Sequence, residues 1–118
     1  MKVLRVYHGD DEQTHFEEVD LPLEPSTGAS NHRTPPRPAS QAMFASQNPG
    51  SFLDWHPAPS RRLFVLVAGS AEVGVTDGEK RTITKGDVVL FEDVTGPGHT
   101  MRVLGGTPRV ALHVRMED

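Results

Sequence analysis

The feature of this sequence that most constrains its fold is the regular recurrence of turn residues between short β-branched or aromatic runs. Gly, Pro or Asp ends such a run about every 8–12 residues, and apolar residues do not recur with the helical period of about 3.6. A chain with this rhythm forms about nine or ten strands in a sandwich or a closed barrel. The sequence therefore predicts an all-β protein.

The expected strands form two groups separated by a polar segment. Short opening strands are expected at residues 2–7 and 14–19, and residues 24–40, rich in Pro, Ser and Thr, form an exposed loop or a lid. The remaining strands are expected at residues 41–47, 53–57, 61–69, 70–76, 80–84, 88–93, 100–104 and 109–115. We divide the chain into an N-terminal part, 1–40, which packs on the barrel or on a partner subunit, and a barrel, 41–118.

Length and composition restrict the class of protein and its partners. The 118 residues suffice for one domain, and the absence of cysteine removes disulfides and thiolate sites and fits a reducing cytoplasm. A net charge of −4 provides no basic surface for a nucleic acid, and no apolar run approaches the roughly 20 residues of a membrane helix. We expect a cytoplasmic protein that binds a small molecule, with neither nucleic acid nor membrane as a partner.

Glycines and histidines recur at suggestive intervals in two stretches of the expected barrel. They are Gly50, His56 and Gly69 in the first stretch and Gly86, Gly96 and His99 in the second. At these positions the chain resembles the cupin superfamily, whose first motif is written G-x5-H-x-H-x3-4-E-x6-G and whose second ends in P-x-G-x2-H-x3-N. The resemblance covers about residues 41–115, and the WHPAP segment is similar to small bacterial cupins of unassigned function. It implies a small antiparallel double-stranded β-helix, the cupin or jelly-roll barrel.

The metal motif implied by this resemblance is incomplete. Metal-binding cupins hold a divalent ion with three histidines and one glutamate, whereas here Ala58 stands at the second histidine and Arg62 at the glutamate. In the second motif, valines replace the proline and the asparagine. The remaining candidate ligands are His56 and His99, with His113 or Glu92 as a third. The resemblance thus implies at most a weakly bound Fe, Mn, Ni or Zn ion.

Side-chain alternation places Arg62 inside the barrel, near the two histidines. Residues 56, 58 and 62 share one face of an extended segment, and Phe64 and Leu66 continue that face with apolar side chains. A register slip of one residue would exchange Arg62 with Arg61. A guanidinium about 4 Å from a divalent cation is repelled by about 8 kcal/mol at an effective dielectric of about 20. An inward Arg62 therefore opposes a metal centre like that of the family.

Without a metal, the same residues form an anion receptor that carries proton-transfer groups. The fork of Arg62 suits a carboxylate, enolate or phosphate, while His56 and His99 serve as general acid and base. The expected apolar walls of the ligand pocket are Phe64, Met43 and Met101. We expect an enzyme of the isomerase or lyase type that acts on a small anionic metabolite inside the barrel.

Other functions remain open. In one alternative the barrel binds or senses a small ligand without turnover, and in another it retains a mononuclear metal and acts as an oxygenase or lyase. The sequence does not fix the register of the closing strand, so His113 faces either the pocket or the surface. The short N-terminal strands leave a sheet edge that needs covering, and we expect a homodimer.

Overall fold

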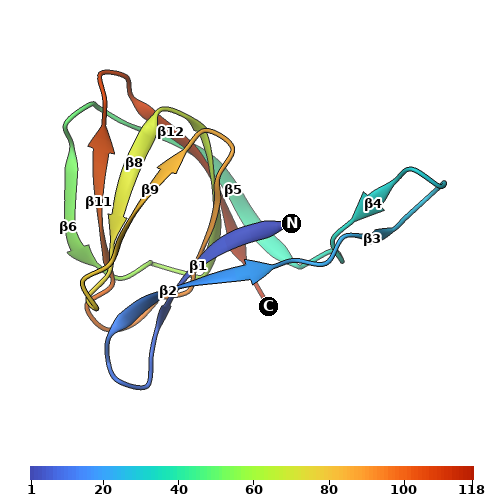
Figure 1. Cartoon of the computed structure of the whole chain (residues 1–118), viewed down its shortest axis with the longest axis horizontal. Helices are drawn as coiled ribbons and strands as arrows, with labels where there is room; N and C mark the ends of the chain where they lie inside the picture. Colours follow the sequence, from blue (N-terminus) through green and yellow to red (C-terminus); the bar gives the residue numbers. More distant parts are fainter.

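The computed structural model describes residues 1–118 and consists of strands and turns, with no helix and thus no helix able to cross a membrane. This confirms the all-β class. The strands are β1 (Lys2–His8), β2 (Thr14–Asp20), β3 (Glu24–Pro25), β4 (His32–Arg33), β5 (Ala39–Gln47), β6 (Phe52–His56), β7 (Arg62–Ala68), β8 (Ser70–Gly74), β9 (Lys80–Thr84), β10 (Val88–Phe91), β11 (His99–Leu104) and β12 (Arg109–Met116) (Figure 1). Every expected strand is present, and only β3 and β4 were not expected.

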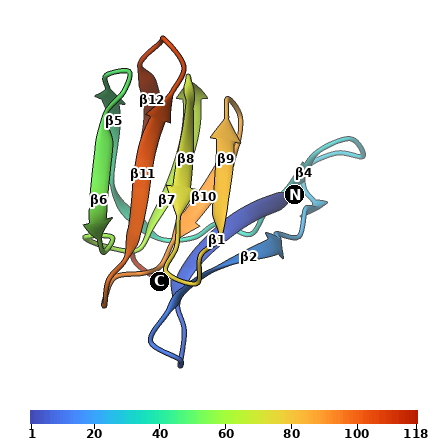
Figure 2. The same ribbon diagram turned by 60° about the vertical axis from the view of Figure 1, so that its left-hand side comes forward.

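The strands form two sheets that face each other, as Figure 2 shows. The larger sheet has the order β2-β1-β10-β7-β12-β5, and the smaller has the order β6-β11-β8-β9. All pairs in these sheets are antiparallel except β1 with β10, which are parallel. This mostly antiparallel, two-sheet arrangement agrees with the expected jelly-roll barrel. The opening strand β1 lies inside the larger sheet, so the N-terminal strands and the barrel are one body.

The polar segment before the barrel differs from the expected structureless loop. Its strands β3 and β4 pair as a short ribbon around Gly28, whose φ is 81°, and Figure 1 shows this ribbon projecting away from both sheets. The barrel begins earlier than expected because β5 starts at Ala39. We call residues 21–38 the arm.

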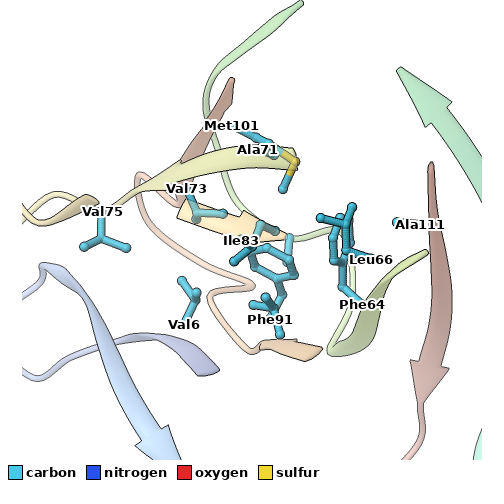
Figure 3. Close-up of a cluster of buried hydrophobic side chains, with 12 residues drawn as sticks. Val6, Phe64, Leu66, Ala71, Val73, Val75, Ile83, Phe91, Met101 and Ala111 are labelled. Atoms are coloured by element: carbon cyan, nitrogen blue, oxygen red, sulfur yellow. The ribbon is translucent and has the colours of Figure 1, made fainter. Parts of the chain in front are cut away.

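The hydrophobic core fills one side of the space between the sheets. Its members come from the loop after β6, from the turn after β8 and from strands β1, β7, β8, β9, β10, β11 and β12, and Figure 3 shows these side chains gathered in one cluster. Phe64 of β7 meets Phe91 of β10 edge to face, with ring centroids 5.5 Å apart. Strands β5 and β6 contribute no core residue, and their side chains Met43, Phe44, Leu53 and Trp55 are exposed. The side of the barrel between β5 and β6 is therefore left for a polar cavity.

Candidate functional site

A cavity of about 70 Å³ opens between the two sheets on the side of β5 and β6. Its nitrogen-bearing side chains are His56, Arg62, His99, Arg109 and His113, and its apolar walls include Leu53, Phe64, Phe91 and Met101. A larger hollow of about 380 Å³ lies elsewhere, between β1 and β9, and contains no histidine. We take the smaller cavity as the candidate site because it brings together five nitrogen-bearing side chains, which can donate hydrogen bonds or transfer protons.

A β-bulge aims His56 into this cavity. His56 pairs with His99 and Leu53 pairs with Met101, so strand β6 has two residues where β11 has only Thr100. The extra residue lets Leu53 and His56 line the same cavity although they are three positions apart. The Nδ1 atom of His56 lies 2.6 Å from the main-chain oxygen of Asp54, to which it donates. The ring is thereby fixed with Nε2 as its remaining nitrogen.

Gly98 lets the chain pass close enough to β6 for the two histidines to pair. Its φ is 78°, and an added Cβ would overlap the main-chain oxygen of His56. Only glycine satisfies both the left-handed backbone and this close approach. The glycine that precedes His99 thus determines the spacing of the two strands at the site.

His99 forms a buried pair with Asp93. The Nδ1 of His99 lies 2.6 Å from Oδ2 of Asp93, and the relative exposures of the two residues are 5% and 0%. The main-chain oxygen of Asp93 accepts a hydrogen bond of 2.9 Å from the amide of Ala58, which ties the loop after β10 to the segment after His56. Phe91 stacks on the His99 ring with centroids 4.4 Å apart. With Nδ1–H donated to the carboxylate oxygen, Nε2 is the ring nitrogen that is left for a further contact.

The rings of His56 and His99 lie side by side, with centroids 4.6 Å apart. In each ring Nδ1 is held by an oxygen, so Nε2 is the nitrogen left for the cavity that both rings line. A ring nitrogen that carries a lone pair can accept a proton, and an oriented acceptor of this kind can serve as a general base.

Arg62 points into the cavity, as side-chain alternation predicts, and Arg61 points away from it. The Nη1 of Arg62 donates to Nδ1 of His113 at 3.2 Å and its Nη2 donates to Oγ of Ser60 at 3.2 Å. No carboxylate pairs with Arg62, and its buried Nε has no partner. Burial, and after it the charge of Arg115, lowers the pKa of Arg62.

Arg109 is a second cation in the cavity, and its burial is nearly complete. Only 3% of the residue is exposed, its Nη2 donates to Oε1 of Gln47, and its guanidinium lies 5.1 Å from the centroid of the Phe64 ring. Neither Nε nor Nη1 has a hydrogen-bond partner. Burial lowers the pKa of Arg109. A buried guanidinium without a carboxylate is costly, and an anion placed beside it would offset that cost.

His113 lies between the two arginines and is held neutral. Burial, followed by the charges of Arg62 and Arg109, lowers its pKa to about 4. A guanidinium only donates, so Nδ1 of His113 must accept from Arg62 and the ring proton must reside on Nε2. This Nε2–H is buried and has no acceptor. His113 therefore offers a neutral hydrogen-bond donor between two cations.

The unpaired polar atoms of the molecule concentrate at this site. Five of the six buried side-chain nitrogen and oxygen atoms that lack a partner belong to Arg62, Arg109, His113 and Asp93. All of these except Oδ1 of Asp93 are donors. Buried polar groups are normally satisfied, so these donors are available to water or to a molecule rich in acceptors.

Of the other site residues predicted from the sequence, three line the cavity and two do not. Phe64 and Met101 line the cavity, and the register of β12 places His113 there. Met43 lies opposite His113 on β5, is 53% exposed, and lines a neighbouring groove instead of the cavity. Glu92 does not line the cavity, because Arg5 donates to it at 2.5 Å and Arg61 at 2.7 Å on another side of the barrel.

The residues of this cavity do not fit the metal centre that the cupin resemblance implies. No three His, Asp or Glu side chains are grouped so that they can hold a metal ion. The three imidazoles of the cavity share it with the cations of Arg62 and Arg109, which repel a divalent ion. The third histidine, His113, accepts from Arg62 on Nδ1 and carries its proton on Nε2, so it offers no free nitrogen to a metal. The two that remain, His56 and His99, are fewer protein ligands than a catalytic zinc site uses.

Sequence reasoning missed Asp93 and Arg109. For Asp93 a signal was present, because Val89, Phe91 and Asp93 alternate along one face while Glu92 belongs to the other. All three are buried, with exposures of 2% or less. Arg109 is the first residue of β12, and the sequence does not show which face of that strand points inward. No sequence motif marks Arg109 as a site residue.

Comparisons with known proteins give structural likeness only, since no protein-family model and no curated protein matches this sequence. The cupin domain of Schizosaccharomyces pombe Cnp3 superposes with a TM-score of 0.55 at 13% identity, over 99% of this chain and 84% of that one. An uncharacterized conserved protein of Klebsiella pneumoniae with a double-stranded β-helix domain gives 0.50 at 20% identity, over 80% and 82%. The capsular polysaccharide assembling protein CapF of Staphylococcus aureus gives 0.52 at 20% identity, over 84% of this chain and 30% of that one. At these identities the likeness concerns the fold.

Proposed function

This chain has the cupin fold, and from that premise we propose that it is a small-molecule-binding protein that receives a compact anion and acts on it by acid–base chemistry. The reaction is of the isomerase or lyase type. One observation carries the proposal: a buried guanidinium, Arg109, and a half-buried one, Arg62, both without carboxylate partners, line the same cavity as the imidazole that Asp93 orients.

Anion binding follows from the unpaired donors. Arg62 and Arg109 supply fixed positive charge, and His113 supplies a neutral N–H between them. A carboxylate or enolate placed against them gains charge-assisted hydrogen bonds in a largely desolvated setting. The same ligand also offsets the cost of keeping Arg109 out of water.

Proton transfer is assigned to the two paired imidazoles. His99, oriented by Asp93, uses Nε2 to remove a proton from the carbon next to the ligand's carbonyl group. The electron pair of the broken C–H bond moves onto the carbonyl oxygen, and the resulting enolate is stabilised by Arg62 and by Nε2–H of His113. The proton held on His99 is then returned to a neighbouring atom, directly or through His56, which completes an isomerisation. Loss of a leaving group from the enolate completes an elimination instead.

A mononuclear metal centre is the weaker alternative. Its support is that both imidazoles have Nδ1 held by an oxygen and Nε2 free, the arrangement of histidines that bind metals. Against it stand the two arginines and the missing further ligands. Metal analysis of protein purified without a polyhistidine tag tests this, since near-stoichiometric iron, manganese, nickel or zinc contradicts the proposal.

The experiment for the main proposal separates binding from catalysis. Binding of a panel of small 2-oxo and 2-hydroxy carboxylates is measured by calorimetry, and deuterium incorporation next to their carbonyl carbon is followed by proton NMR in D2O. We expect Arg109→Gln to weaken binding strongly and His99→Gln to abolish exchange while binding remains. Binding without exchange by the wild-type protein identifies the alternative, a non-catalytic ligand-binding barrel. No binding by any member of the panel overturns the anion receptor.

A further inference from the structure

A groove of about 270 Å³ adjoins the cavity on the inner face of the larger sheet. It is lined by Gln41, Ala42, Met43, Arg62, His113 and Arg115. Arg62 and His113 also line the cavity, so the two hollows meet at these side chains. The cavity alone, at about 70 Å³, is smaller than ordinary ligand pockets of about 300–1,000 Å³, so a ligand of more than a few atoms extends into the groove.

The groove contains a pair of like charges held opposite each other. Arg115 of β12 is the direct register partner of Arg62 on β7, and both side chains line the groove. Like charges directly opposite on a sheet are destabilising. Arg115 has Glu117 at 3.2 Å from its Nε, but that carboxylate does not line the groove, and Arg62 has no acidic partner at all. An anion between the two guanidinium groups would offset their repulsion.

Positive charge therefore occurs at both ends of the combined site. Arg109 stands in the cavity, Arg62 and Arg115 stand in the groove, and the neutral His113 lies between. We propose that the ligand is a dicarboxylate that spans both hollows, with one carboxylate against Arg109 and the other between Arg62 and Arg115. This inference rests on the anion receptor proposed above and specifies its ligand class.

Calorimetric titration of the full chain at pH 7 and low salt tests the inference. The probes are malonate, succinate, glutarate and adipate, with butyrate as the single-acid control that has the carbon number of succinate. We expect at least one dicarboxylate to bind at least about ten-fold more tightly than butyrate, and its affinity to fall as salt screens the charges.

Variants separate the two halves of the site. Arg115→Gln should reduce the affinity for the dicarboxylate to that for butyrate and leave butyrate binding unchanged, whereas Arg109→Gln should weaken both. Arg102→Gln is the matched control, because Arg102 stacks on Phe52 away from the groove, and it should change neither affinity. Without ligand, the Tm of Arg115→Gln should be no lower than that of the wild type, since relief of the opposed charge offsets loss of the exposed pair with Glu117, and this measurement separates lost binding from misfolding.

The outcomes distinguish the two proposals. Equal affinity for all the acids, with no effect of Arg115→Gln, overturns the dicarboxylate and leaves the anion receptor intact. Absence of binding for every acid, butyrate included, together with no binding in the panel of 2-oxo and 2-hydroxy acids, overturns the receptor itself.

Discussion

Asp93 holds His99 through a hydrogen bond of 2.6 Å between Oδ2 and Nδ1, and both side chains are buried. This contact joins the loop after β10 to the first residue of β11, so the orientation of the imidazole depends on a residue six positions earlier. Because Asp93 does not line the cavity, the proposed function makes it a positioning residue that acts through His99.

We expect the Asp93 side chain to affect deuterium exchange of the ligand more than the affinity for the ligand. In Asp93→Asn the amide oxygen can still accept from Nδ1–H, but the negative charge that stabilises a protonated His99 is lost. We expect deuterium exchange to fall by about 100-fold or more, with ligand affinity within a factor of about two. Asp93→Ala leaves a buried imidazole N–H unpaired and should cost about 1–3 kcal/mol in urea unfolding. Equal exchange rates in Asp93→Asn and wild-type protein would remove Asp93 from the mechanism.

The pKa of His113 gives a prediction about stability and pH. Folding lowers this pKa from 6.5 to about 4, so between these values the unfolded chain binds a proton that the folded chain does not. The free energy of unfolding contributed by His113 therefore falls as the pH drops from about 6.5 towards 4. The loss of stability between pH 7 and pH 5, from urea midpoints, should be smaller in His113→Gln than in the wild type.

Proton NMR titration checks the same group directly. His113 should remain neutral at pH 5.5, and Arg109→Gln should raise its pKa because one of the two nearby charges is removed. A His113 ring that titrates near 6.5 in the wild-type protein contradicts the position assigned to it between the arginines.

The close approach of Gly98 to β6 can be separated from its backbone conformation. Gly50 has nearly the same φ, 79°, but nothing lies within 4 Å of an added Cβ. Gly50→Ala should therefore lower the free energy of unfolding only by the strain of a left-handed backbone, about 1–2 kcal/mol. Gly98→Ala adds an overlap with the His56 backbone and should cost about 2–5 kcal/mol in total. Chemical denaturation of both variants measures the difference, and equal costs would show that β6 moves freely away from β11.

The sequence predicted that Arg62 points into the barrel, but it did not show which face of the closing strand points inward. Strand β7 alternates Arg62, Phe64 and Leu66, and the two apolar residues identify the inner face, with exposures of 1% and 0%. In β12 the larger apolar residues are Val110, Leu112 and Val114, yet they face outward. The inner face of β12 instead carries Arg109, Ala111, His113 and Arg115.

The reason lies in what each strand faces. Strand β7 packs against the hydrophobic core, so the apolar residues in its sequence identify the side chains that are buried. Strand β12 faces the cavity and carries polar residues on its inner face, so the apolar pattern of this strand points to the wrong face. The same holds for β6, where a bulge breaks the alternation that sequence reasoning relies on.

The outward apolar face of the larger sheet is our remaining prediction, and it concerns the homodimer expected from the sequence. Phe44 of β5, Leu112 of β12, Val65 of β7 and Val88 of β10 are successive register partners and so form one apolar row across four strands. Phe44 is 71% exposed, and β5 is a sheet edge of nine residues with neither a charged residue nor a proline to block pairing. Such a face is expected to be covered by a second copy.

Light scattering of wild-type protein should give twice the mass of one chain, and Phe44→Asp should shift it towards the mass of a single chain. Leu23→Asp, which changes an exposed apolar residue of the arm, is the matched control and should leave the dimer unchanged. If Leu23→Asp dissociates the dimer and Phe44→Asp does not, the interface lies at the arm. A wild-type protein with the mass of one chain would contradict dimer formation altogether. Because Met43, next to Phe44, lines the groove, the same measurement on ligand-saturated protein would reveal whether occupancy of the site and pairing of the chains are coupled.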